Sequence, residues 1–254
     1  MSGDLAKSSP YSVRGQPEAD AVQALFAAIA SRYDLINDLQ SLGLHRRWKR
    51  RVADLASVRP GDQALDVCCG TGDIALELAT RGAQVVGLDL CRPMLDIAER
   101  RRDRGTRSGR PGPRGDALRF IQADALHLPF PDSSFDVVTA GYGLRNLADW
   151  RRGLAEMHRV ARPGGRLIVL DFGRPANPVW RAVYMAYLRS VVPLLGLAAC
   201  GNRRAYAYIH QSLRRYPAQQ GLEDAMREIG LVKVSTVNLL GGAMTITRAK
   251  KTGT

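Results

Sequence analysis

Apolar residues recur with two different periods along the chain, and the two periods alternate. Residues 63–69 form a short apolar run that predicts a strand, whereas residues 73–81 repeat apolar side chains at helical spacing. Further strands are predicted at 84–90, 119–123, 136–140 and 166–172, with helices at 93–102 and 149–161. Strands that alternate with helices form right-handed βαβ units, so the pattern predicts a parallel sheet with helices on both faces.

Beyond residue 172 the pattern changes to helices and then to a hairpin. Helices are predicted at 178–197, 203–216 and 222–229. Two strand-like runs, 232–239 and 243–249, flank Gly241-Gly242 and predict an antiparallel hairpin at the edge of the sheet. The predicted fold is therefore α/β, Rossmann-like, with a mostly parallel seven-stranded sheet.

Length favours one domain, because 254 residues fill a single α/β core with some elaboration. We expect a flexible tail at 1–20 and a single domain at 21–254, with N-terminal helices at 21–60 and a helical cap at 174–216. Residues 105–115, rich in Gly, Pro and Arg, predict an exposed loop. The polar N-terminus lacks the order of a signal peptide, so a cytoplasmic protein is expected.

Arginine gives the chain a formal net charge of +13. This excess favours an anionic partner, either nucleic acid or a phospholipid surface, but it can equally be a compositional habit. The four cysteines and four histidines show no metal-ligand spacing, so no metal site is expected. Adjacent Cys68 and Cys69 would point to opposite sides of a strand, which suits small buried side chains in the wall of a turn.

The turn Gly70-Thr71-Gly72 joins a predicted strand to a predicted helix, so free backbone N–H groups face the carboxyl edge of the sheet. Glycine there permits close approach of a ligand. Asp89, which ends the second strand, is placed to accept both hydroxyls of a ribose. The same glycine spacing also fits a dinucleotide site and is a weak signal alone.

Carboxylates near the turn favour a cationic ligand over a pyrophosphate. Asp66 precedes the turn and Asp73 follows it, where an anion would be repelled. S-adenosylmethionine carries a sulfonium, an ammonium and a ribose, and Asp124 beside Ala125 could meet its adenine. For Asp66, the alternative is a hydrogen-bond acceptor that only fixes the loop.

Four stretches of sequence resemble the class I methyltransferases, and more narrowly the UbiE/MenG (COQ5-like) family of quinone C-methyltransferases. They are 33–49 (beginning YDLIND), 66–73 (DVCCGTGD), 141–146 (GYGLRN) and 162–172 (beginning RPGG). The resemblance implies S-adenosylmethionine as cofactor, N-terminal lid helices and a helical insertion after the fifth strand. It also carries cofactor contacts over to Thr71, Asp89, Asp124 with Ala125, and Gly141, where relatives often have serine.

For this family a ring carbon of a reduced quinone must be methylated, and a phenolate makes that carbon nucleophilic. Arg145 cannot readily lose a proton, so we assign it to stabilising the phenolate or holding a water, with Asn146 orienting that water or a quinol oxygen. The alternative is a structural ion pair at the strand end. Tyr33, one helical turn from Asn37, is expected on a lid over the site. The expected substrate contacts are Tyr33, Asn37, Tyr142 and Arg145, and the catalytic residues are Arg145, Asn146 and Tyr33.

The apolar stretch 178–199 contains Arg181, Arg189 and Pro193, and its charge-free part is too short to span a bilayer. It suits walls for a polyprenyl tail and an interfacial patch at the inner face of the membrane, or an ordinary buried helix. The expected reaction converts demethylmenaquinol to menaquinol. A small-molecule O- or N-methyltransferase is the runner-up. An RNA methyltransferase is disfavoured, because the fourth strand lacks an Asn/Asp-Pro-Pro-aromatic turn and no Pro-Cys pair occurs. The sequence leaves a homo-oligomer open.

Overall fold

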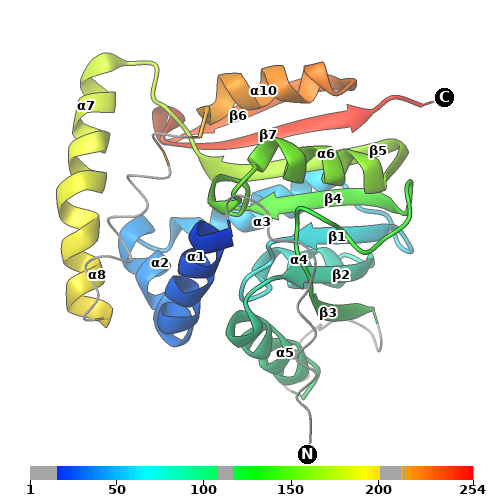
Figure 1. Cartoon of the computed structure of the whole chain (residues 1–254), viewed down its shortest axis with the longest axis horizontal. Coiled ribbons are helices and arrows are strands. Elements are labelled where there is room, and N and C mark those ends of the chain that lie inside the picture. The colour runs from blue at the N-terminus through cyan, green and yellow to red at the C-terminus, as the bar shows by residue number, and fades with distance from the viewer. Residues whose placement is uncertain (1–15, 108–116, 201–212, 214–215, 254) are drawn as a thin grey trace, which may run out of the picture.

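The computed structural model describes residues 16–107, 117–200, 213 and 216–253. A seven-stranded sheet runs through the middle of the molecule in the order β3-β2-β1-β4-β5-β7-β6 (Figure 1). The strands are β1 Gln63–Val67, β2 Gln84–Asp89, β3 Leu118–Gln122, β4 Phe135–Gly141, β5 Ala161–Phe172, β6 Leu231–Leu239 and β7 Met244–Lys251. All neighbours from β3 to β5 pair in parallel, and β7 is antiparallel to both β5 and β6. The predicted parallel sheet and the antiparallel edge hairpin are both confirmed.

Helices pack on both faces of the sheet. One face packs on α6 Trp150–Val160 and α10 Ala218–Glu228, and the other on α3 Leu44–Ala56, α4 Asp73–Thr80 and α5 Arg92–Arg107. Consecutive residues of one strand pack into the cores on opposite faces of the sheet, as Ala64 and Leu65 do. Because both faces are buried, the strands read as apolar runs rather than as alternating ones.

Several boundaries differ from the sequence predictions by a few residues. Strand β5 starts at Ala161 rather than at 166, because the Pro-Gly-Gly turn stays in the strand at an irregularity of its pairing with β4. Helix α5 continues to Arg107 rather than ending at 102. Helix α1 Gln16–Ile29 begins inside the expected tail, with Pro17 in its first turn, where a missing N–H costs nothing.

The N-terminal helices α1, the short turn Ala30–Arg32, α2 Tyr33–Ser41 and α3 follow one another before β1. Helix α2 packs against α3 and against α8, and the turn Ala30–Arg32 lies against α5. The segment predicted as N-terminal helices is therefore helical and lies beside the carboxyl edge of the sheet.

After β5 the chain forms α7 Pro178–Ala186, a π-helical segment Tyr187–Val191 and α8 Val192–Cys200. They stand as one column beside the sheet (Figure 1), so the predicted helix at 178–197 is confirmed with a π-helical interruption. The predicted helix at 203–216 and the predicted loop at 105–115 lie largely outside the described residues. Within the described part of the chain, no helix is both long enough and apolar enough to cross a bilayer.

Candidate functional site

The glycine turn joins β1 to α4 at the carboxyl edge of the sheet. Gly70 and Gly72 have φ of +54° and +83°, in the left-handed region that favours glycine. A Cβ added at Gly72 would lie 2.9 Å from the Phe120 ring, whereas one added at Gly70 would meet nothing within 4 Å. The turn is thus packed from behind and open in front, where a ligand can approach its backbone.

Asp89 lies at the end of β2 beside this turn. Its carboxylate accepts hydrogen bonds from Gly70 N at 2.8 Å and from Cys91 N at 2.9 Å. Burial raises the pKa of Asp89 above its ordinary value, although these N–H groups favour the charged form. The half-buried side chain is positioned as predicted, and its contact with a ribose stays a prediction.

The remaining predicted cofactor residues also end strands or follow them at this edge. Asp124 follows β3, is half-exposed and accepts a hydrogen bond from Leu126 N at 2.8 Å, while the adjacent Ala125 is buried. Gly141 ends β4, and a Cβ there would lie 2.6 Å from Ile74 Cδ1. The Ile74 side chain therefore occupies the space into which a serine side chain would project.

Asp66 is buried beneath the turn, with 1% of its surface exposed. It accepts hydrogen bonds from Ala75 N at 3.1 Å and from Thr139 Oγ1 at 2.7 Å. Burial raises its pKa to about 7 against the effect of these donors. These contacts are those of the loop-fixing alternative, so Asp66 holds β1, α4 and β4 together.

Asp73 does not present a free charge to a ligand. Its two oxygens bind Lys49 Nζ at 2.6 Å and Arg101 at 2.8 Å. Burial lowers the pKa of Lys49, but Asp73 outweighs this and raises it. The sequence analysis predicted that Asp66 and Asp73 line the crevice with negative charge, and this is wrong for both residues. Among the predicted cofactor contacts, only Asp89 and Asp124 keep a negative charge for a ligand.

Thr71 links the glycine turn to helix α2. Its hydroxyl donates to Asp34 Oδ1 at 3.0 Å, and the other oxygen of Asp34 pairs with Arg101. Because Thr71 is 1% exposed, its predicted hydroxyl contact with a cofactor would need this bond to give way. Asp34 therefore fastens the start of α2 directly over the turn.

Arg145 forms a buried ion pair at the end of β5. Its Nε lies 3.1 Å from Asp171 Oδ1, and its guanidinium stacks over Phe172 at 4.8 Å from the ring centroid. Burial raises the pKa of Asp171 to about 6, opposed by Arg145. Asn146 accepts from Arg145 at 3.1 Å and donates to Tyr142 O at 2.9 Å. The predicted structural pair is present, and Asn146 fixes the guanidinium plane.

The substrate residues expected from the lid and from the 141–146 motif share this region. Tyr142 has φ +61°, a conformation that costs energy outside glycine, and its ring lies beside Phe172 and under Lys49. Burial raises the pKa of Tyr142 well above its ordinary value, and the charge of a Tyr33 phenolate would add to this rise. The Tyr142 hydroxyl, Asn37 Nδ2 and Asp171 Oδ2 are buried and have no hydrogen-bond partner among the described residues.

Cys68 and Cys69 form the wall of the turn. Cys68 packs with the core on the α6 face and Cys69 with the core on the α4 face. Burial raises the pKa of both thiols well above the ordinary value. Among the described residues, no three Cys, His, Asp or Glu side chains converge as metal ligands. The sulfur atoms thus have a packing role.

Three charged residues of the site were missed from sequence: Lys49, Arg101 and Asp171. A signal existed for two of them. Asp171 lies at the carboxyl end of a predicted parallel strand, where ligands bind. Lys49 shares a helical face with the buried residues His45, Trp48, Val52, Ala53 and Ala56, so a charge on that face needs a partner inside the protein.

Comparison with known proteins agrees with this geometry. The model of the ubiE/COQ5 methyltransferase family matches residues 14–251. The demethylmenaquinone methyltransferase of Thermus thermophilus is 45% identical over 81% of this chain and 90% of its own length. That of Deinococcus radiodurans is 43% identical over 85% and 86%. The ubiquinone/menaquinone biosynthesis C-methyltransferase UbiE of Ectopseudomonas mendocina is 40% identical over 92% and 90%.

Solved structures at low identity share the fold. A S-adenosylmethionine-dependent methyltransferase of Thermotoga maritima, described as a possible histamine N-methyltransferase, has a TM-score of 0.61 at 18% identity and covers 91% of this chain and 99% of its own. The [4+2]-cyclase SpnF has a TM-score of 0.60 at 18% identity, with 93% and 97% covered. A cyclase and a methyltransferase on one fold show that the fold alone does not fix the reaction. The family model and the relatives at 40% identity or more show the family: the chain belongs to the ubiE/COQ5 methyltransferase family.

Proposed function

We propose that the protein transfers a methyl group from S-adenosylmethionine to a ring carbon of a polyprenylated quinol, with demethylmenaquinol as the preferred acceptor. The observation that supports the proposal most is that two groups of residues lie at the same carboxyl edge of the sheet. The glycine turn with Asp89 provides a nucleoside site, and Arg145 with Asn146 provides a fixed cation after the neighbouring strand β4. Family membership identifies the reaction class, and this edge contains the residues for it.

The residues present fit the cofactor. Gly70 leaves open space before the turn, and Asp89 and Asp124 end or follow neighbouring strands beside it. Asn37 Nδ2 and Tyr142 Oη are buried without a hydrogen-bond partner among the described residues, as expected where a polar ligand completes the site. When bound, S-adenosylmethionine supplies an electrophilic methyl group on a sulfonium.

The protein's own part of the reaction is to favour the phenolate and to exclude water. The Arg145 guanidinium is fixed by Asp171, Phe172 and Asn146, so it stabilises developing negative charge on a quinol oxygen without reorganising. Tyr33 and Asn37 on α2 cover the site, and the bond from Thr71 to Asp34 holds α2 down. In this proposal residues 21–60 act as a lid, and Tyr33, Asn37, Tyr142 and Arg145 contact the quinol.

The prenyl tail would lie along α7 and α8 of the expected helical cap, and the protein would dock there on the inner face of the cell membrane. Large apolar side chains are exposed on α7, α8 and α2, and Figure 1 shows these helices grouped on one side of the sheet. They are Val179, Val183, Leu194, Leu197, Leu35 and Leu39, and Leu42 directly after α2 is 89% exposed. A patch of this kind on one side of a molecule is typical of an interaction with a partner or a membrane.

The test combines the purified protein with S-adenosylmethionine bearing a deuterated methyl group and a chemically reduced demethylmenaquinone with a short prenyl tail. Mass spectrometry should find the label on the quinone ring carbon. Label on oxygen, or on added RNA, would identify the runner-up activities instead. In a deletion strain, the quinone pool should accumulate the species that lacks one methyl group. Calorimetry with the cofactor product and with a pyridine nucleotide should give binding of the former only.

A further inference from the structure

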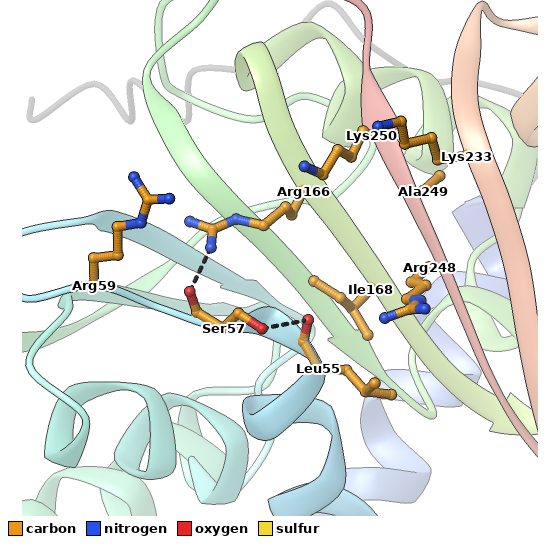
Figure 2. A pocket seen from close by; sticks show the side chains of 9 residues that line it. All are labelled: Leu55, Ser57, Arg59, Arg166, Ile168, Lys233, Arg248, Ala249 and Lys250. Carbon is orange, nitrogen blue, oxygen red and sulfur yellow. Dashed lines mark hydrogen bonds between the residues drawn. The ribbon is translucent and has the colours of Figure 1, made fainter.

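A cavity lies where β5, β7 and β6 meet the end of α3 (Figure 2). Its volume is about 420 Å³, within the usual range for small-molecule sites. It is bordered by the end of α3 and the following turn, by the first half of β5, and by β7 and β6. Arg166 of this cavity lies six residues before the end of β5, roughly 20 Å from the carboxyl edge.

The cavity exists because helices cover only part of this sheet face. Arg166 pairs in register with Lys250 and Ile168 with Arg248, so the side chains of both strands stand side by side on the same face. Helix α3 covers β5 on this face, whereas α10 packs on β6 and β7 from the opposite one. The β7–β6 side of the face is therefore open next to α3.

Five cationic side chains line the cavity, and no acidic residue among those described does: Arg59, Arg166, Lys233, Arg248 and Lys250. Arg166 is held in place by an ion pair with Asp62 and by donating to Ser57 O at 2.5 Å. Arg248 donates to Ser235 Oγ at 3.1 Å. Within the described part of the chain, no carboxylate pairs with Arg59, Lys233, Arg248 or Lys250.

Lys233 reaches this cavity through a strained backbone. The pairing of β6 with β7 shifts between Val232 and Ser235, and Lys233 between them has φ +54°. A bulge re-aims a side chain, and a left-handed conformation is unfavourable for a residue other than glycine. Strain of this kind is concentrated at binding sites.

We propose that this cavity binds a soluble anion that carries at least two phosphoryl groups. Four cations of this cavity have no carboxylate partner among the described residues, and a concave site of this size with such a charge matches a compact multivalent anion better than a single carboxylate. A membrane surface is flat, whereas this site is concave, so a compact soluble anion fits it better.

Calorimetry with inorganic pyrophosphate and the full-length protein tests the proposal. The wild type should bind pyrophosphate more tightly than orthophosphate, with affinity that falls as salt rises. Lys233→Asn removes one charge while asparagine tolerates the left-handed conformation, so the protein should stay folded and lose about tenfold in affinity. Arg248→Gln combined with Lys250→Gln should lose about a hundredfold.

Arg119→Gln is the matched control, because Arg119 is an exposed strand residue on β3 outside the cavity. It should bind pyrophosphate as the wild type does, and thermal denaturation should show every variant folded. Absence of pyrophosphate binding, or an equal loss in Arg119→Gln, would overturn the proposal. So would binding that depends on the cavity residues but occurs only with vesicles containing phosphatidylglycerol, since the phosphate would then belong to a lipid headgroup. Methyl transfer is not part of any of these measurements.

Discussion

At the scale of single residues, buried Asp66 lowers the stability of the fold by an amount that depends on pH. Its pKa rises from 3.8 to about 7 on folding. Between these values the native state binds more protons than the unfolded state, so stability falls as pH rises. Once the pH exceeds 7, the total loss in the free energy of unfolding is on the order of 4 kcal/mol.

Asp66→Asn should remove this pH dependence. The amide oxygen can accept from Ala75 N while the amide nitrogen donates to Thr139, so both contacts survive. Urea denaturation at pH 5 and pH 8 should show the wild type losing stability at the higher pH and the variant losing much less. Cofactor affinity should change little, because the side chain is buried. A parallel loss in both proteins would contradict the assignment.

Asp136 provides a control, because its contribution to stability changes with pH in the opposite direction. Burial raises its pKa, but Gln63 N and Arg162 outweigh this and lower it. It therefore stabilises the fold above its unfolded pKa and loses that contribution as pH falls. Asp136→Asn should reduce stability at pH 7, where Asp66→Asn increases it.

Arg145 is the residue on which the proposed chemistry depends. Arg145→Ala should lower turnover by about a hundredfold or more with cofactor affinity nearly unchanged, because the guanidinium stabilises charge that develops during the reaction. It should also cost about 3–5 kcal/mol of stability by leaving Asp171 buried without its cation. Adding Asp171→Asn should restore most of the stability and none of the turnover. Recovery of both would mean that Arg145 serves only as a structural ion pair.

At the scale of elements, the lid helix α2 is held by a small charged network. Asp34 accepts from Thr71 at the turn and pairs with Arg101 of α5, which in turn pairs with Asp73 of α4. A second contact joins Tyr187 Oη to Gln40 O at the other end of α2, at 2.8 Å. The lid is therefore fastened at its start and at its end by different elements.

Asp34→Ala should release the start of α2 while leaving the sheet intact. Hydrogen bonds to a charged group contribute roughly 1.5–3 kcal/mol, so amide exchange in residues 33–41 should accelerate at least about tenfold. Asp54→Ala, which breaks an exposed pair with Arg81, should leave this exchange unchanged. Hydrogen-exchange mass spectrometry compares the two. Equal exchange in α2 of the wild type and Asp34→Ala would show that packing alone holds the helix.

At the scale of the whole molecule, the apolar column α7–α8 and the basic cavity give the protein two different surfaces. Val183 and Leu194 are 54% and 56% exposed on the column. Replacing both by Asp should abolish most of the association with vesicles of phosphatidylethanolamine and phosphatidylglycerol, because inserting charged side chains into the bilayer is costly. Val232→Asp, at an exposed position of the edge strand β6, is the control and should float with vesicles as the wild type does. Equal flotation of all three proteins would remove the proposed docking face.

Much of the fold follows from periodicity alone. Apolar runs of strand length, each followed by helical spacing, predicted the parallel sheet, and Gly241-Gly242 between two strand-like runs predicted the edge hairpin. The ends of the predicted strands also placed three candidate cofactor residues correctly in the fold, since Asp89, Asp124 and Gly141 all lie at the carboxyl edge. These features depend on neighbours in sequence, or on a rule that holds for every parallel sheet.

The charge state of the site was decided by tertiary structure. Asp73 reads as a free carboxylate in the sequence, but Lys49 and Arg101, 24 and 28 residues away, neutralise it. Asp66 lies so deep that its pKa reaches about 7, and Lys233 faces the cavity only because β6 is irregular. Electrostatic energy depends on distance and on burial, and neither is fixed until the chain has folded. The sequence therefore determined where the site is, and the packing of distant segments determined which of its charges remain free.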